Sequence, residues 1–219
     1  MIKQLLAGAI ASILLTATAA SAATLSLIGT GQTQLVAGND IVPSLNGQTI
    51  NFIDGAAKTV ANGLFLDTTG GAEVTYTFLG GEAGHRNFAA VNGNRAFFNN
   101  GRRETAAGAQ VSVTQSVSGL LDFAFGTTAP SWARGIFQNN GLAWTRSDSI
   151  DPYNFAMGFV QLSATAFYVL FDDIAAGDRD FDDMAIQIDV AAVPIPAGGL
   201  LLLSGLGGAL LLRRRKVLT

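Results

Sequence analysis

Six aspartates crowd into FDDIAAGDRDFDD, residues 171–183, and this segment carries the strongest chemical signal in the chain. Like charges this close repel one another unless a cation lies among them, and Arg179 offsets only one unit. Calcium carries two charges and prefers about six to eight oxygen ligands on a flexible loop. The alternate spacing of Asp178, Asp180 and Asp182 suits such ligands. We therefore predict that this loop binds Ca²⁺.

The same spacing begins an EF-hand loop, but the match ends there. Asp183 stands where that loop needs glycine, and MAIQIDV after it alternates like a strand instead of continuing as a helix. The prediction is a calcium loop that closes a β-hairpin. Two alternatives stay open: a solvated acidic loop without metal, and a pair of catalytic carboxylates of the kind that hydrolyse glycosides.

Few other residues suggest chemistry. His85 is the one histidine, and neither G-x-S-x-G nor H-E-x-x-H accompanies it, so we interpret it as a polar turn residue. Trp132 and Trp144 are expected in the core, with a sugar-binding platform as the alternative. The chain has no cysteine, which excludes disulfides and thiolate chemistry. We expect no catalytic residues and no enzymatic activity.

Alternating patterns predict the strands that position these residues. AEVTYTFLG (72–80), AQVSVTQSVSG (109–119) and LLDFAFG (120–126) each predict a strand with one face in water. The apolar run 167–171 and the alternating segment 184–190 predict a hairpin, with Asp172 to Asp183 as its loop. No repeat and no long helical pattern lies between the ends. We expect an all-β fold, an antiparallel β-sandwich of jelly-roll type, as a single domain over residues 23–192.

The N-terminus has the layout of a secretory signal peptide. Lys3 precedes an apolar run from Leu5 to Leu15, and small residues at Ala20 and Ala22 follow it. The apolar run is too short to span a bilayer comfortably. We predict a signal peptide over residues 1–22, removed by signal peptidase during export.

The C-terminus has a second membrane-directed pattern. VPIPA (193–197) precedes an uncharged run at 198–212, and the cations Arg213, Arg214, Arg215 and Lys216 follow. Counted from Val193, the stretch has about 20 residues, the length that spans a bilayer. The cations obey the positive-inside rule. We predict one transmembrane helix over 198–212, with the basic tail 213–216 in the cytoplasm and the domain outside.

Charge is distributed unevenly along the chain. All 16 acidic residues lie between residues 23 and 212, with 8 of the 13 basic ones, so the exported part has a net charge near −8. Phosphate backbones need a basic face, which makes nucleic acid an unsuitable partner.

The C-terminal segment VPIPAGGLLLLSGLGGALLLRRRK resembles the VPLPA variant of PEP-CTERM sorting signals, with isoleucine at position 195 where leucine is usual. The resemblance implies a sorting motif of Val193, Pro194, Ile195, Pro196 and Ala197. It implies recognition by an exosortase-like membrane peptidase of Gram-negative bacteria that also make exopolysaccharide. The tail would then hold the protein in the cell envelope and be cut near the motif, and the domain would pass to the cell surface or extracellular matrix.

The body is similar to exported proteins with such tails in two places. VTYTFLGGEAGHRNF resembles their strand followed by a G-x-E-A-G-x-x-N turn, and LFDDIAAGDRDFDDMAIQI resembles their G-D-x-D-[FY]-[ND]-D hairpin. The second likeness implies calcium-binding roles for Asp178, Asp180 and Asp183, with Asp173 as an acid before the loop. Together with Asp182 from the spacing, these form the expected metal site.

The function expected from these observations is structural. We expect an exported, non-enzymatic surface or matrix protein, stabilised by calcium and sorted by an exosortase-type system, with exopolysaccharide as a further partner. The alternative is an exported carbohydrate-binding module or glycan-active enzyme.

Overall fold

A computed structural model describes residues 22–29, 32–54, 62–82, 84–99, 103–128, 135–140, 155–173 and 179–194, and the backbone alone for 143–145. Residues 1–21 of the expected signal peptide, and the expected transmembrane helix and basic tail, lie outside this description. Contacts gather residues 22–192 into one compact unit. No helix among the described residues has the length and apolar character needed to cross a membrane.

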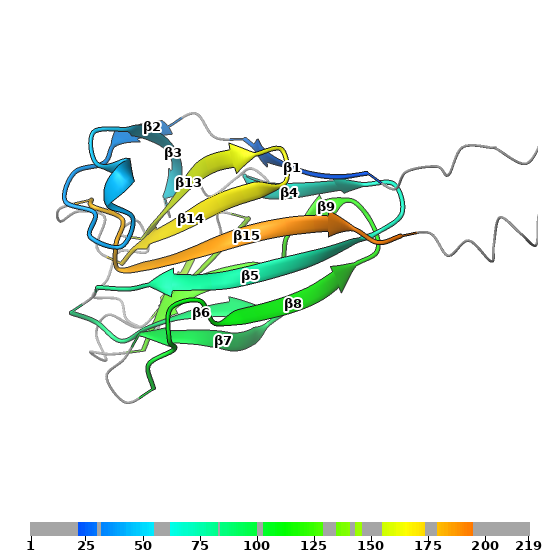
Figure 1. The fold of residues 1–219 in the computed structure, drawn as a ribbon. Coiled ribbons are helices and arrows are strands. Elements are labelled where there is room, and N and C mark those ends of the chain that lie inside the picture. Colours follow the sequence, from blue (N-terminus) through cyan, green and yellow to red (C-terminus); the bar gives the residue numbers. More distant parts are fainter. Residues whose placement is uncertain are drawn as a thin grey trace, which may run out of the picture. The chain divides into compact units, whose positions relative to one another are not determined.

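The described residues form strands and one short 3₁₀ helix (Figure 1). In chain order the elements are β1 (Ala23–Ile28), β2 (Gln32–Leu35), η1 (Pro43–Leu45), β3 (Thr49–Asp54), β4 (Gly63–Thr68), β5 (Ala72–Gly80), β6 (Asn87–Val91), β7 (Asn94–Asn99), β8 (Gln110–Gln115), β9 (Gly119–Leu120), β10 (Phe123–Thr127), β11 (Gly135–Gln138), β12 (Ala143–Thr145), β13 (Ala156–Ser163), β14 (Ala166–Asp172) and β15 (Met184–Ala192).

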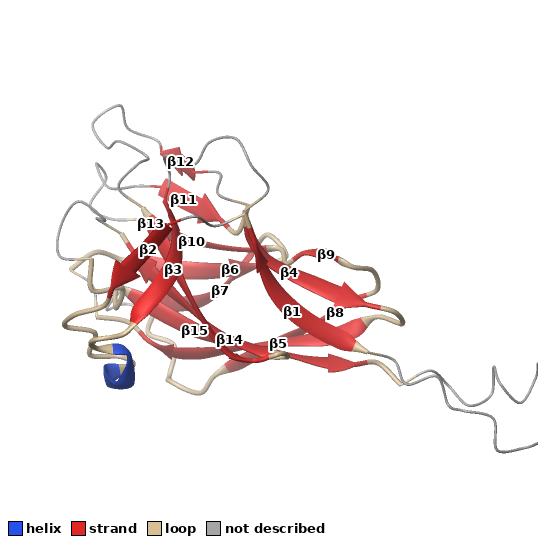
Figure 2. Cartoon of the chain, turned by 90° about the horizontal axis from the view of Figure 1, so that it is seen from above, coloured by secondary structure: helices blue, strands red, loops and turns tan. Residues whose placement is uncertain are grey.

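The strands form three antiparallel sheets. A seven-stranded sheet has the order β2-β3-β13-β14-β15-β5-β8, and a five-stranded sheet has the order β12-β11-β10-β6-β7. A small sheet of β1, β4 and β9 completes the unit. The expected all-β antiparallel architecture is confirmed, and the arrangement is consistent with a β-sandwich. In Figure 2, seen from above, the five-stranded sheet and the seven-stranded sheet form separate layers.

Alternation along the strands produces the core, as the sequence pattern predicts. In β5, Val74, Tyr76 and Phe78 are buried, whereas Glu73 is exposed. Successive side chains of a strand point to opposite faces, so this pattern buries one face of the seven-stranded sheet. The predicted hairpin is also confirmed: β14 pairs antiparallel with β15, and Phe171 lies opposite Met184 across the acidic loop.

Aromatic side chains join the two large sheets. The Phe171 ring of β14 stacks on the Phe125 ring of β10, with 5.0 Å between centroids and an interplanar angle of 6°. Tyr76 of β5 meets Phe123 edge-on at 6.2 Å. Each such ring buries about 150–250 Å², so these contacts supply much of the hydrophobic driving force.

The strand β10 departs from its predicted character. The alternation in LLDFAFG predicts one face in water, but every residue of β10 is buried. The strand lies in the middle of the five-stranded sheet, between β6 and β11. A Cβ at Gly126 would lie 2.6 Å from the Phe88 ring, so the face opposite the core is covered by a neighbouring aromatic side chain. The sequence pattern predicts that the small residues Ala124 and Gly126 face water. In the structure their small size instead allows this close packing.

Asn139 ties the three-stranded sheet to the five-stranded sheet. It follows β11, its side chain is buried, and its Nδ2 donates to the carbonyls of Leu64 and Leu121, both at 2.9 Å. Its Oδ1 accepts from the Leu64 N–H at 2.8 Å. This amide therefore supplies the acceptor for the buried Leu64 N–H. It also adds a second donor to the two carbonyls, which accept from the N–H groups of Leu121 and Phe123 as well.

We expect Asn139→Ala to destabilise the domain by about 3 kcal/mol, since it removes three buried hydrogen bonds and leaves the Leu64 N–H without an acceptor. For a domain of this size that lowers the melting temperature by roughly 6–12 °C, which calorimetry on residues 22–192 measures. Asn94→Ala is the control, because Asn94 is exposed and bonds only locally, to the Asn92 carbonyl. Equal melting temperatures for both variants would contradict the role of Asn139.

Candidate functional site

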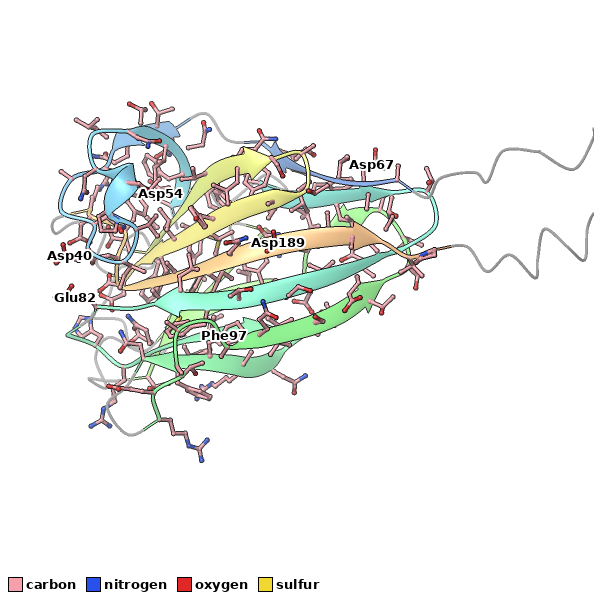
Figure 3. The ribbon with its side chains drawn as sticks, viewed as in Figure 1. Asp40, Asp54, Asp67, Glu82, Phe97 and Asp189 are labelled. Atoms are coloured by element: carbon pink, nitrogen blue, oxygen red, sulfur yellow. The ribbon has the colours of Figure 1, made fainter. Side chains whose placement is uncertain are left out.

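Three segments meet at one end of the domain, and together they carry the acidic loop. They are residues 39–42, which precede η1, the described residues of the 81–87 segment that leads from β5 into β6, and the described parts of the β14–β15 loop, Asp173 and residues 179–183. Figure 3 shows Asp40 and Glu82 beside each other at this end, with Asp67 at the opposite end. Strand ends from both large sheets thus position the site.

The first group of acids is the carboxylate triad Asp40, Glu82 and Asp182. One ligand oxygen from each lies within 4.8 Å of the others. Two hydrogen bonds donated by backbone N–H groups hold the three segments together. Asp40 N–H donates to the side-chain Oδ2 of Asp182 at 3.0 Å, and Glu82 N–H donates to the Asp182 backbone carbonyl at 2.8 Å. Asp182 is buried, while Asp40 and Glu82 are exposed. Solvent can therefore reach the triad at Asp40 and Glu82, whereas the third acid, Asp182, is buried.

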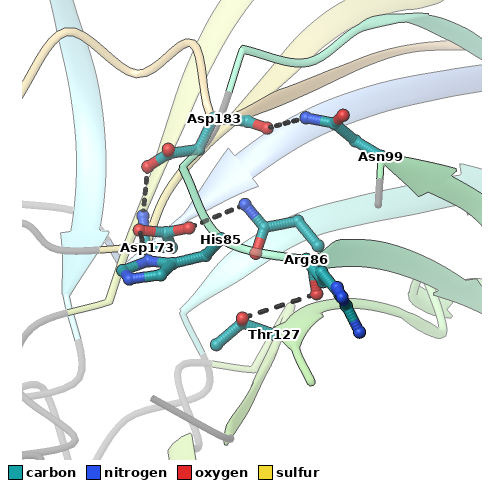
Figure 4. A network of polar contacts seen from close by, with 7 residues as sticks. His85, Arg86, Asn99, Thr127, Asp173 and Asp183 are labelled. Atoms are coloured by element: carbon teal, nitrogen blue, oxygen red, sulfur yellow. Dashed lines mark hydrogen bonds and ion pairs between the residues drawn. The ribbon is translucent and has the colours of Figure 1, made fainter. Parts of the chain in front are cut away.

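The second group is the inner network of His85, Asn87, Asp173 and Asp183. Figure 4 labels His85, Asp173 and Asp183 in this network. His85 Nδ1 lies 2.9 Å from Asp173 Oδ1, and Asn87 Nδ2 donates to Asp173 Oδ2 at 2.7 Å. Asp173 N–H donates to Asp183 Oδ2 at 2.6 Å. Both oxygens of the buried Asp173 carboxylate therefore have partners from the 81–87 segment.

Asn39 fixes the shape of the acidic loop. Its side chain is wholly buried, and its Nδ2 donates to the carbonyls of Asp180 and Phe181, both at 3.0 Å. Its Oδ1 accepts from the Val42 N–H at 2.6 Å. The loop backbone is thereby held although Phe181 has φ of +60°, a conformation that costs free energy for a residue with a side chain.

The phenyl ring of Phe181 anchors the same loop. It is buried, and it lies 6.0 Å from the Phe52 ring. It belongs to a second apolar cluster on the face of the seven-stranded sheet opposite the main core, where Val36, Val42 and Leu45 cover Ile50. Phe181 stands between Asp180 and Asp182 in the sequence, and its ring packs in this apolar cluster. The Asp182 carboxylate instead lies in the carboxylate triad.

Gly81 allows the β5–β6 segment to approach the acidic loop. A Cβ at this position would lie 2.7 Å from the Asp183 carbonyl and 2.6 Å from Asn99 Nδ2. Real Cβ atoms essentially never come so close to backbone atoms. Glycine at position 81 therefore lets the segment that carries Glu82 lie close to the segment that carries Asp182.

Burial and mutual repulsion raise the pKa values of two of these acids. Burial raises the pKa of Asp182 to about 7, together with the hydrogen bond and charge of Asp180 and the charge of Glu82, although the Asp40 N–H acts in the opposite direction. Burial, followed by the charge of Asp173, raises the pKa of Asp183 to about 9, against the Asp173 N–H bond. Near neutral pH these carboxylates hold protons or need a cation.

The predicted ligands are divided by the structure. Asp182 lies in the carboxylate triad, and Asp180 is next to it, with Oδ1 accepting from the Asp182 N–H at 3.3 Å. Asp173 and Asp183 belong to the inner network. Asp178 lies outside the described residues.

Five residues of the site were not among the predicted ligands. Asp40 and Asn39 come from a loop far back in the chain, in which no motif singles them out. Glu82 and Asn87 occupy the acid and asparagine positions of the G-x-E-A-G-x-x-N pattern, which is the signal that points to them. His85, predicted as a polar turn residue, lies in a bend and contacts Asp173.

The other residues singled out in the sequence fall mostly outside the description. Trp132, Ile195 to Ala197, and 213–216 are not described, and for Trp144 only the backbone in β12 is. Val193 and Pro194 follow directly after β15.

The raised pKa values predict how stability depends on pH when no metal is present. A carboxyl whose pKa is higher in the folded chain than its ordinary value of 3.8 binds its proton more tightly when folded. Its contribution to stability is complete below pH 3.8 and is lost as the pH rises to about 9 for Asp183.

We therefore expect the metal-free domain to have a lower free energy of unfolding at pH 8 than at pH 5, measured by urea denaturation in chelator. Asp183→Asn should reduce this difference, because the amide stays uncharged and still accepts the Asp173 N–H. Asp67→Asn, at the opposite end, should leave it unchanged (Figure 3). A profile that is flat, or that rises with pH, would show that burial does not penalise these charges.

Comparisons with known proteins assign no family to this arrangement. No family model matches the chain, and no curated protein shows significant similarity to it. The function must therefore be argued from the site itself.

Proposed function

We propose that this is an exported, non-enzymatic protein of the cell surface or extracellular matrix, a jelly-roll-like sandwich whose acidic end is stabilised by Ca²⁺. The carboxylate triad is the observation that carries the proposal. Its acids come from three segments far apart in the sequence, so an ion bound there would link all three.

The donor set suits a hard divalent cation. Oxygens bound to one Ca²⁺ at about 2.3–2.6 Å lie at most about 5 Å apart. The triad's oxygens lie within 4.8 Å of one another, and all are carboxylate oxygens. Two of the three acids are exposed, so water can complete the coordination as calcium sites often require. In this proposal Asp40, Glu82 and Asp182 hold the ion, and Asp180 lies beside them.

Calcium would relieve the electrostatic cost described above. The charge of Glu82 and the carboxyl of Asp180 both disfavour ionised Asp182, and a divalent cation reverses that balance. The ion needs the ionised ligands, so protons compete with it and its affinity should increase with pH. Calcium would thus supply structural stability and no chemical step.

We expect Ca²⁺ to raise the melting temperature of residues 22–192. At about a hundredfold excess over its dissociation constant, one ion adds about 2.7 kcal/mol, which corresponds to roughly 5–10 °C here. Calorimetry with and without chelator measures the shift.

Glu82→Gln should abolish most of this shift because it removes one ligand charge. Glu73→Gln is the matched control: Glu73 is exposed at the start of β5, whereas Glu82 follows the end of that strand. If wild type shows no calcium-dependent shift, or if both variants respond alike, the calcium proposal fails. Magnesium in place of calcium tests selectivity.

The sorting part of the proposal rests on the sequence of the two ends. We propose that signal peptidase removes residues 1–22 and that an exosortase-like peptidase acts at Val193 to Ala197. The basic residues 213–216 hold the tail in the membrane before that step.

Intact mass spectrometry of the protein recovered from producing cells tests this. We expect a chain that begins near Ala23 and ends between residues 193 and 197. Replacing Pro194 and Pro196 by alanine should leave the tail attached, because the expected motif is gone while the apolar run remains. A wild-type chain that still ends at Thr219 would contradict sorting and identify a plain anchor.

A further inference from the structure

Sheet edges differ in how they are protected. The edge strands β2, β9 and β12 are short, with four, two and three residues. The outer edge of β1 is bonded, since Leu25 N–H donates to the Ala164 carbonyl at 2.8 Å. The outer edge of β7 is bonded through Phe98, whose carbonyl accepts from the Thr105 N–H at 2.9 Å. Short length and bonded edges both prevent further strand pairing.

The strand β8 has none of these protections among the described residues. It has six residues, QVSVTQ, with no charge and no proline, and it pairs with β5 without a register shift. It forms one of the two edges of the seven-stranded sheet, opposite the edge formed by β2 (Figure 1). An uncharged edge of this length, in continuous register with its neighbour, is a template for another strand.

The register with β5 indicates which backbone groups of β8 point outward. Phe78 N–H donates to the Ala109 carbonyl at 2.9 Å, immediately before β8, so this carbonyl points toward β5. Successive residues of a strand alternate in direction. Gln110, Ser112 and Thr114 therefore direct their N–H and C=O groups away from β5, and their side chains are exposed.

We propose that two copies of this protein pair through β8, antiparallel and related by a twofold axis, which joins their seven-stranded sheets. With Ser112 opposite Ser112 of the second copy, Gln110 lies opposite Thr114, so the outward backbone groups of both strands meet in register. Val111 then lies opposite Val113 on the core-facing side. A twofold contact uses the same patch on both copies, and this strand is complementary to itself.

The distribution of charge favours a second copy at this edge. The exported part is strongly acidic, so copies repel each other over most of their surface. β8 carries no acid, and Glu73, opposite Thr114, is the acidic residue paired with it across the β5 ladder. The carboxylate triad lies where β5 ends, beyond Gly80. Two acidic copies therefore approach along β8 with little repulsion.

Disulfide trapping in the full-length chain tests the contact, because the wild-type chain has no cysteine. In the proposed register the two Ser112 Cα atoms lie about 5.5 Å apart, within the range that a disulfide spans. Ser112→Cys should give a disulfide-linked dimer on mild oxidation in expressing cells, several-fold more than Thr33→Cys. Thr33 is the exposed counterpart on the other edge of the same sheet, in β2.

Charge substitutions in the Ser112→Cys background test the register. Gln110→Lys with Thr114→Lys places lysine opposite lysine twice, and we expect loss of the cross-linked dimer. Gln110→Glu with Thr114→Lys places opposite charges in the same positions, and the dimer should return. Both variants place lysine at position 114, opposite Glu73 of the same copy. Any effect of this lysine on the fold of the monomer is therefore the same in both.

Equal cross-linking at Thr33→Cys and Ser112→Cys would indicate random collision and overturn the proposal. So would no dimer at Ser112→Cys in a protein whose circular dichroism and melting temperature match wild type. A dimer that persists with lysine at both positions would overturn the register. The test is repeated in chelator, so its result does not depend on the calcium proposal.

Discussion

Repulsion among carboxylates that are partly removed from water is the constraint on which the acidic end of this protein depends. Asp182 and Asp183 both have raised pKa values, because burial and neighbouring acids oppose their ionised forms. Backbone N–H groups of Asp40 and Asp173 donate to them, which lowers the cost without removing the charge. The folded end is therefore more stable when these carboxyls hold protons or when a cation lies among them. Its pH dependence and its proposed calcium binding have this one physical origin.

A rigid scaffold holds these charges together. The hairpin of β14 and β15 lies inside the seven-stranded sheet, flanked by β13 and β5, and stacking of Phe171 on Phe125 fixes it against the second layer. The loop is secured from the other side by Asn39 and by the buried ring of Phe181. Acids carried on loops are thus positioned by packing elsewhere, as is general for polar groups on loops that a rigid scaffold holds.

The two proposed interactions use separate parts of the same sheet. The carboxylate triad lies at the ends of strands, whereas the pairing surface runs along the side of β8. A calcium ion would stabilise the unit without touching the edge, and edge pairing would leave the acidic end exposed. An edge pair of six-residue strands buries little area, so such contacts suit molecules concentrated at a surface more than dilute ones.

The sequence by itself determined the class of fold and the central hairpin. Alternation in β5 and in β15 predicted which side chains face the core, since a strand has a period of two whatever it packs against. It also identified the acidic loop. It did not predict that β10 would be buried on both faces, because that depends on neighbours supplied by other strands.

Only the tertiary structure decided which acids lie together. The loop's aspartates look like one ligand set in the sequence, but the inward turn of Phe181 and the contacts of Asp173 divide them. Asp182 instead meets Asp40 and Glu82, which are distant along the chain. Neighbours in a loop need not share a site, because side-chain direction is set by local backbone geometry. Residues far apart come together when strand pairing brings the segments that carry them to the same end of the domain.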